Sequence, residues 1–401
     1  MKIYETKDGK NYLLPFILVT SLFFLWGIAN NILDVLNKHF QDAFELSKAH
    51  SGLVQAAIYG GYFLMAIPAG KIISRWGYRS GVLTGLILFG IGALLFIPGA
   101  GINSFYFFVL CLFIIGCGLT CLETSANPYI TVLGDPSRAA QRINLAQSFN
   151  GLACIVAPVL GGQLVLANDN LTLPYTIIGV VVLLVALLFT RVKLPEIPDE
   201  PVEATDGTTA EHRGLWSAPT FVLGVTALFL YVAAQTGVNS FFINYMDENL
   251  GIDPTRAANL LGYGGMGLFF VGRVTGTWIM SYVKPWLLLT LYALTATLSM
   301  LVIIFGQGTP ALVAFFVVYF CESIMFPTIF ALALRHVKGH TKEASSYLIM
   351  SIVGGAVAPV LMGWIGDRAG MALGFLVPAV CYAVIFIYGL YYGNRQKSNA
   401  R

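Results

Sequence analysis

Charged side chains are scarce in this sequence. Of its 401 residues only 11% are Asp, Glu, Lys or Arg, while 57% are hydrophobic. Soluble domains carry about 25% charged residues, because their surfaces face water. The composition therefore excludes a soluble globular protein. The net charge of +3 is small and gives no reason to expect a nucleic-acid partner.

The residue patterns of enzymes and metal sites are also missing. The six cysteines form no CxxC pair, lack a His-rich partner segment, and all lie within apolar segments: Cys111, Cys117, Cys121, Cys154, Cys321 and Cys381. The string GYGGMG at 262–267 matches GxGxxG, but it lies in an apolar segment with no preceding strand, so it does not predict a dinucleotide site. We expect neither an enzyme nor a bound cofactor or metal.

Long apolar runs are abundant, and they come in blocks of about 18 to 25 residues, the length that crosses a bilayer as a helix. Membrane barrels instead show short alternating segments, so the pattern predicts an all-α membrane protein. Twelve transmembrane helices are predicted, at residues 14–37, 52–71, 81–98, 104–133, 143–166, 172–191, 219–245, 256–282, 285–306, 309–333, 342–366 and 371–393.

Lysine and arginine are distributed unevenly over the predicted loops. One side of the membrane holds only Lys38, Lys48, Arg256 and Arg368, and Arg273 lies within the eighth span. The remaining basic residues fall on the side of both termini, which the positive-inside rule predicts to be cytoplasmic. The first span ends without a small-residue cleavage site, so we expect it to be retained.

The chain repeats itself across a polar segment. Span 4 reads CLETSANP and span 10 reads FCESIMFP, span 5 contains APVLGG and span 11 APVLMG, and spans 1 and 7 open on VTSLFFLW and VTALFLYV. All three pairs are separated by about 200 residues. We predict an N-terminal six-helix half at 1–191, a cytoplasmic linker at 192–218 and a C-terminal half at 219–401, an architecture typical of transporters.

Polar residues inside the spans mark a candidate site. A charge at a helix centre costs about 2.5–3.5 kcal/mol on insertion scales, yet Asp34, Glu123, Arg273 and Glu322 all lie within spans. Amides and hydroxyls share helical faces with these carboxylates or with each other, and such groups bind sugar hydroxyls in pairs. The faces comprise Asn30, Asn31 and Asp34; Thr120, Glu123 and Asn127; Asn144, Gln147 and Asn150; and Gln235 with Asn239.

Structural roles are the alternative for these residues. Amides commonly join helices in membrane bundles, and Glu322 and Arg273 are expected to pair with each other or to brace the second half. For Asp34 and Glu123 we favour proton coupling, because a carboxylate in a low-dielectric cavity can bind a proton near neutral pH.

Two sets of residues carry a family resemblance. GKIISRWGYRSG at 70–81 resembles the loop signature of the major facilitator superfamily, with Ser74 in place of the usual acid, and GDRAG at 366–370 resembles its core. FFLWGIANNILDVL, CLETSANPYITVLG and INLAQSFNGLACIVAPVLGG resemble the fucose/galactose/glucose:proton symporter family along nearly the whole chain.

The resemblance implies the major facilitator fold and import of a monosaccharide by proton symport in the bacterial inner membrane, by a monomer surrounded by lipid. It assigns proton coupling to Asp34 and Glu123 and sugar contacts to Asn31, Gln147 and Asn150. We add Asn30, Asn127, Gln235 and Asn239 as candidate substrate-binding residues from their positions. Sodium coupling, with Asp34 and Asn31 supplying oxygen ligands, stays open, as do an exporter of amphipathic compounds and a sugar receptor.

Overall fold

The computed structural model describes residues 4–5, 11–44, 48–102, 104–161, 172–191, 194–195, 215–306, 308–335, 337 and 340–398. Within these ranges the chain is almost entirely helical, as expected where lipid offers no partner to an exposed backbone amide or carbonyl.

In the described residues of the first half, six labelled α-helices and a short 3₁₀ turn follow one another, and α2 is itself two helices that meet at Gly77. They are α1 (Leu13–Ala43), α2 (Lys48–Leu94), α3 (Phe96–Ile102), α4 (Phe105–Val132), η1 (Pro136–Arg138), α5 (Ala139–Gly161) and α6 (Thr172–Arg191).

The second half contains more, shorter elements because several spans are interrupted. They are η3 (Leu215–Ser217), α7 (Pro219–Leu250), α8 (Pro254–Asn259), the π-helical η4 (Leu260–Met266), α9 (Gly267–Ile279), α10 (Pro285–Phe305), α11 (Thr309–Glu322), α12 (Met325–Leu334), α13 (Thr341–Met350), η5 (Ser351–Val353), α14 (Gly354–Ala369), α15 (Met371–Gly374) and α16 (Leu376–Ser398).

The predicted spans all correspond to helical segments. Nine helices of the described ranges are long and apolar enough to cross a membrane. One of these nine, α2, is two spans joined at Gly77, whose φ of 83° breaks the helix. The other two are spans 5 and 8. Span 5 corresponds to α5, whose polar face lowers its hydropathy, and span 8 is divided by the π-helical segment between α8 and α9. The prediction of twelve transmembrane helices is confirmed in this way.

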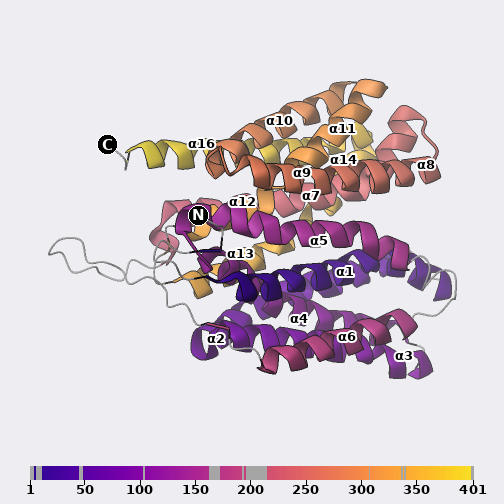
Figure 1. Cartoon of the computed structure of the whole chain (residues 1–401). Coiled ribbons are helices and arrows are strands. Elements are labelled where there is room, and N and C mark those ends of the chain that lie inside the picture. The colour runs from indigo at the N-terminus through magenta and orange to yellow at the C-terminus, as the bar shows by residue number, and fades with distance from the viewer. Residues whose placement is uncertain are drawn as a thin grey trace.

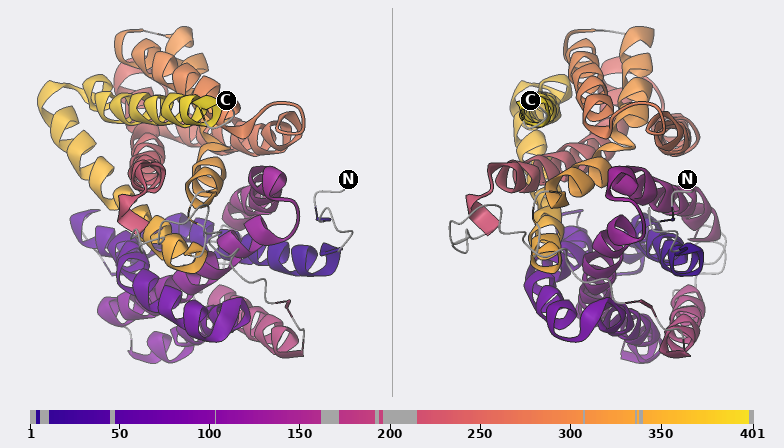
Figure 2. Two further views of the ribbon diagram at one scale, coloured as in Figure 1. Left: turned by 90° about the vertical axis from the view of Figure 1, so that its left-hand side faces the viewer. Right: turned by 60° about the vertical axis from the view of Figure 1, so that its left-hand side comes forward.

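The two halves lie one above the other, as Figures 1 and 2 show, with α1–α6 in one layer and most of the later helices in the other. Both ends of the chain lie on the left in Figure 1. We call this the linker end, because α6 ends and α7 begins there. The predicted boundaries at residues 192 and 218 stay a prediction, since residues 192–193 and 196–214 lie outside the described ranges.

Most of the packing between helices of the two halves involves α5 and α13. α5 contacts α9 and α12, and α13 contacts α2 and α4. These two contacts are equivalent under the repeat, because α5 and α13 contain the starts of spans 5 and 11. We therefore expect the substrate site at the interface between the halves.

Candidate functional site

Glu123 is buried at the centre of a polar cluster in the first half. Its side chain is 6% exposed, and the Tyr62 hydroxyl of α2 donates a hydrogen bond to its Oε1. The Asn30 side chain of α1 hydrogen-bonds to the same tyrosine, and Asn127 lies one turn further along α4, close to the carboxylate. We call Asn30, Tyr62, Glu123 and Asn127 the Glu123 cluster.

In the described part of the chain, no basic side chain neutralises this carboxylate. Among the described residues no Lys, Arg or His lies within 4.0 Å of Glu123. A buried charge without a counter-ion is costly, and binding a proton removes that cost. The cluster thus has the chemistry of a proton site surrounded by neutral hydrogen-bonding groups.

Arg273 joins the second half to the amide face of α5. Its side chain is 5% exposed. Nη1 donates to the Gln147 carbonyl oxygen at 2.7 Å, to Gln147 Oε1 at 3.3 Å and, at the limit of hydrogen bonding, to Asn150 Oδ1 at 3.5 Å. Nε donates to the Ser323 carbonyl oxygen at 2.8 Å. We call Gln147, Asn150, Arg273 and Ser323 the Arg273 cluster.

Glycines bring α9 close to the junction of α11 and α12, where Ser323 lies. A Cβ atom at Gly272 would lie 2.5 Å from the Phe320 carbonyl oxygen, and one at Gly276 would lie 2.5 Å from Ile324. The guanidinium of Arg273 also lies over the Phe269 ring, 4.5 Å from its centroid, which adds a cation–π contact. Close packing and stacking together hold Arg273 at the interface.

Glu322 does not form the ion pair with Arg273 that the sequence suggested. It is fully buried, and Tyr382 Oη donates to its Oε2 at 2.8 Å, but its Oε1 has no hydrogen-bond partner among the described residues. Within the described part of the chain, no ion pair of 4.0 Å or less joins the two residues. They do interact electrostatically. Arg273 therefore bridges the halves instead of pairing inside its own half.

The repeated prolines explain two contacts between helices. Proline has no N–H, so the carbonyl four residues before it loses its helical partner. Pro327 frees the Ser323 carbonyl, which accepts from Arg273. Pro128 frees the Thr124 carbonyl, which accepts from the Ser345 hydroxyl of α13 at 3.0 Å. Each Glu-to-Pro motif thus provides a carbonyl acceptor in the residue after its glutamate.

Other hydrogen bonds close the linker end. Gln141 Nε2 of α5 donates to Ser281 Oγ at 2.6 Å, and Asn144 Nδ2 donates to Thr328 Oγ1 of α12 at 3.1 Å. Asn144 shares its helical face with Gln147 and Asn150, yet its side chain serves as a link between the halves. The Asn144 side chain therefore joins helices of the two halves, which is the structural role considered as the alternative to sugar binding.

A contact further along α2 links the halves near the middle of the bundle. Tyr59 Oη lies 3.4 Å from Thr236 Oγ1 of α7. Tyr59 is three residues from Tyr62, so one face of α2 carries both the contact to α7 and the contact to Glu123. The Glu123 cluster is thereby next to the interface between the halves.

The remaining predicted residues have weaker structural support. Gln235 and Asn239 flank Thr236 on α7 and are half-buried, and Asn239 Oδ1 is buried without a hydrogen bond. Asn31 donates to the Gly27 carbonyl of its own helix at 2.7 Å. Asp34 lies in α1, but its side chain is outside the described residues.

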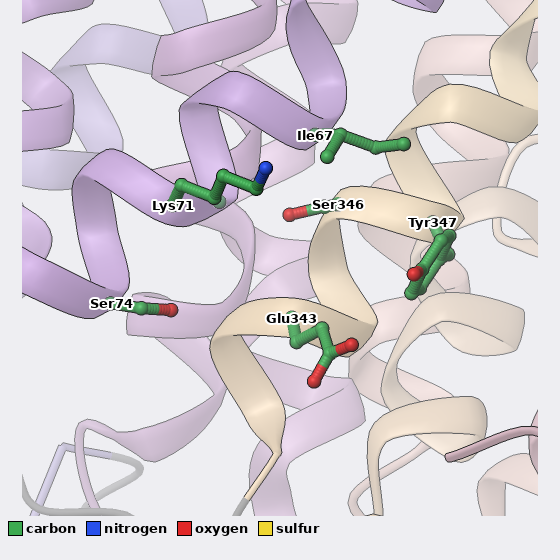
Figure 3. Close-up of a pocket in the computed structure, with 7 residues that line it drawn as sticks. Ile67, Lys71, Ser74, Glu343, Ser346 and Tyr347 are labelled. Atoms are coloured by element: carbon green, nitrogen blue, oxygen red, sulfur yellow. The ribbon is translucent and has the colours of Figure 1, made fainter. Parts of the chain in front are cut away.

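The part of α2 that carries the superfamily signature lies against α13. A cavity of about 280 Å³ lies there. Figure 3 shows Lys71 of α2 and Ser346 of α13 pointing toward one another across it. Gly70 packs directly on Ser346, and Arg79 donates to carbonyl oxygens at the end of α6. Ser74, which replaces the usual acid, lines the same cavity.

Tyr59 and Tyr62 were not predicted as site residues from the sequence, and Arg273 was expected to act only within the second half. Tyrosine is common in membrane helices, so nothing in its type marks it as functional. The spacing in AIYGGYFLM, which places both hydroxyls on one face at mid-span, was the available signal. For Arg273 no sequence signal identifies α5 as its partner.

A helical bundle of this kind, with buried polar clusters at the interface of two halves, defines a membrane transporter. The chain belongs to the Major Facilitator Superfamily, whose family model matches residues 16–351. Its relatives are transporters, so the expectation that it is not an enzyme is confirmed.

Two curated relatives match over almost their whole length. The chain is 40% identical to the L-fucose-proton symporter of Escherichia coli, covering 96% of this chain and 94% of the relative. It is 36% identical to a glucose/galactose transporter of Brucella abortus, covering 96% of both. The crystal structure of the transporter FucP in the outward conformation matches with a TM-score of 0.85 and 39% identity, covering 95% of this chain and 99% of that one.

Proposed function

We propose that this protein imports a monosaccharide of the hexose or fucose type by proton symport. It works as a monomer in the lipid of the bacterial inner membrane, with both termini and the linker end in the cytoplasm. The two halves rock about a site at their interface, which opens alternately to either side. The named relatives transport L-fucose, glucose and galactose, which supports a substrate of this size and polarity.

The observation that carries the proposal is the environment of Glu123. The carboxylate is buried, accepts from Tyr62, and has no basic partner among the described residues. A transported proton needs a group of this kind, and a purely structural carboxylate in a bundle is normally paired. We assign Glu123 and Asp34 to proton coupling.

The amides around this group support a sugar as the co-transported solute. Asn30 and Asn127 belong to the Glu123 cluster, and Gln147 and Asn150 present oxygens at the interface. Amides donate and accept together, as sugar hydroxyls do. We assign sugar binding to these four and to Asn31, Gln235 and Asn239.

The contacts at the linker end support an outward-facing state. Gln141 with Ser281, Asn144 with Thr328, and Ser345 with Thr124 all join the halves there. The similar FucP structure is described as outward. Import then requires these bonds to break so that the site opens to the cytoplasm.

The proposal is tested by uptake into proteoliposomes. Labelled L-fucose, D-glucose and D-galactose are offered separately under an imposed proton gradient or sodium gradient, with protein-free liposomes and a protonophore as controls. We expect uphill uptake of at least one sugar under the proton gradient alone.

The other outcomes are informative. Uptake driven only by sodium would keep the sugar and overturn the coupling role of Glu123. Absence of both uptake and counterflow with every sugar would reject a sugar transporter and favour the exporter or the receptor.

A further inference from the structure

We propose that Arg273 is a two-position latch, bonded to α5 while the linker end is closed and to Glu322 when it is open. The inference rests on the proposed function, because the latch would be released by the sugar. Two sets of acceptors face the guanidinium, the Gln147 and Asn150 oxygens of α5 and the carboxylate of Glu322.

The first position is the one observed. Arg273 makes the hydrogen bonds that reach from α9 to the oxygens of Gln147 and Asn150 on α5. These helices belong to different halves. Opening the linker end moves them apart, so the bonds to α5 must break in the alternative state.

A released guanidinium needs another partner. Five N–H donors left unpaired in a buried position would cost far more than the bonds themselves. Nε can keep its bond to the Ser323 carbonyl, since both residues belong to the second half. The Nη donors require a new acceptor within that half.

Glu322 provides such an acceptor next to Ser323. Its Oε1 is buried without a hydrogen bond, while Oε2 is occupied by Tyr382. Arg273 is already close enough to interact electrostatically with this carboxylate. A change of side-chain rotamer about the fixed Nε to Ser323 bond brings the guanidinium toward Oε1. Tyr231 and Tyr319, the other groups facing Glu322, are neutral phenols and do not compete as cations.

The sugar would compete with Arg273 for the acceptors that hold the arginine in its first position. Gln147 Oε1 and Asn150 Oδ1 are the amide acceptors that we assign to sugar hydroxyls. A bound sugar competes with Arg273 for them, weakens the latch, and favours the move to Glu322. Arg273 is thus a positioning residue that links occupancy of the site to opening at the linker end.

The test measures opening directly, without transport. Spin labels are attached at Trp76→Cys and Tyr282→Cys, two exposed positions at the linker end in different halves, in a variant whose six native cysteines are replaced. The distance distribution gives the fractions of closed and open protein, with and without L-fucose, D-glucose or D-galactose.

The two variants are expected to act in opposite directions. Arg273→Gln removes both positions of the latch. The proposal requires the bonds to α5 to be the stronger ones without sugar, so the open fraction without sugar should rise severalfold. Glu322→Gln leaves the latch but weakens its second position, so the open fraction should fall below that of the unmutated protein. Arg273→Lys should lie between Arg273→Gln and the unmutated protein.

A matched control distinguishes the latch from general loss of packing. Arg142 is a fully buried arginine that donates to carbonyls of its own half, those of Ile130, Thr131 and Asp135, and Arg142→Gln should leave the distances unchanged. Shifts in the same direction for Arg273→Gln and Glu322→Gln, or no shift in either, would overturn the latch. Opposite shifts without sugar, but no response to any sugar, would retain the latch and reject the proposed substrate.

Discussion

The hydroxyl of Ser345 donates a hydrogen bond of 3.0 Å to the carbonyl oxygen of Thr124, a residue of the opposite half. That carbonyl is free because Pro128, four residues later, has no N–H to offer it. A proline in one half thus creates the acceptor that the other half uses to close the linker end.

Ser345→Ala should weaken this closure. A neutral hydrogen bond contributes about 0.5–1.5 kcal/mol, so the ratio of open to closed protein should rise about three- to tenfold. Pro128→Ala supplies an N–H to the Thr124 carbonyl and should act in the same direction. Both changes remove the same bond, so the double variant should open no further than the larger single one. The labels at positions 76 and 282 measure this, and additive shifts would contradict the explanation.

Gly70 should tolerate no side chain while the linker end is closed. A Cβ there would clash with the Ser346 hydroxyl and lie 3.0 Å from Ser346 Cβ. Gly70→Ala is therefore expected to lower the initial rate of sugar uptake several-fold, about what a 1 kcal/mol packing strain produces. Ser346→Gly in the same chain removes the obstacle and should restore the rate. Ser346→Gly alone is the control, and failure of rescue would place the defect elsewhere.

Glu123→Gln should abolish uphill accumulation and keep sugar exchange between the two faces. Glutamine retains the shape and an acceptor for Tyr62 but cannot release a proton. Proton-driven uptake and counterflow of labelled sugar are compared in the same proteoliposomes. Accumulation at the level of the unmutated protein would remove Glu123 from the coupling mechanism.

Tyr62→Phe should slow proton-driven uptake, because it deletes the hydroxyl that donates to Glu123. A hydrogen bond to a charged group is worth about 1.5–3 kcal/mol, which corresponds to at least a tenfold effect on a step that depends on it. Tyr62→Phe should also slow counterflow of labelled sugar. In a protein that already carries Glu123→Gln, adding Tyr62→Phe should slow counterflow no further. An equal loss in both backgrounds would mean that Tyr62 acts through packing.

Asp34→Asn should lose proton-linked uptake while still reaching the membrane, because removing a charge eases insertion. The prediction rests on the position of Asp34 in α1 beside Asn30 and Asn31. The amount of protein in the membrane fraction is measured beside uptake. A variant that is absent from the membrane would indicate a structural role for this carboxylate.

Much of the fold follows from the sequence because a bilayer permits few solutions. Apolar runs of spanning length must be helices, and the repeat of ETSANP and ESIMFP indicates two related halves. The separate spans predicted at 52–71 and 81–98 agree with the break at Gly77, whose backbone angles end the first helix of α2. The π-helical turn at 260–266 was missed, because an apolar glycine-rich segment looks the same in either helix type.

The sequence by itself determined which polar groups are costly and therefore functional candidates, and it placed Glu123, Gln147 and Asn150 among them. Only the tertiary structure decided their partners. Tyr62 reaches Glu123 from another helix, Asn144 became a link between the halves, and Arg273 bonds to α5 instead of Glu322. The physical reason is that helical periodicity fixes which residues share a face, whereas contacts between residues more than a hundred positions apart depend on how the helices pack.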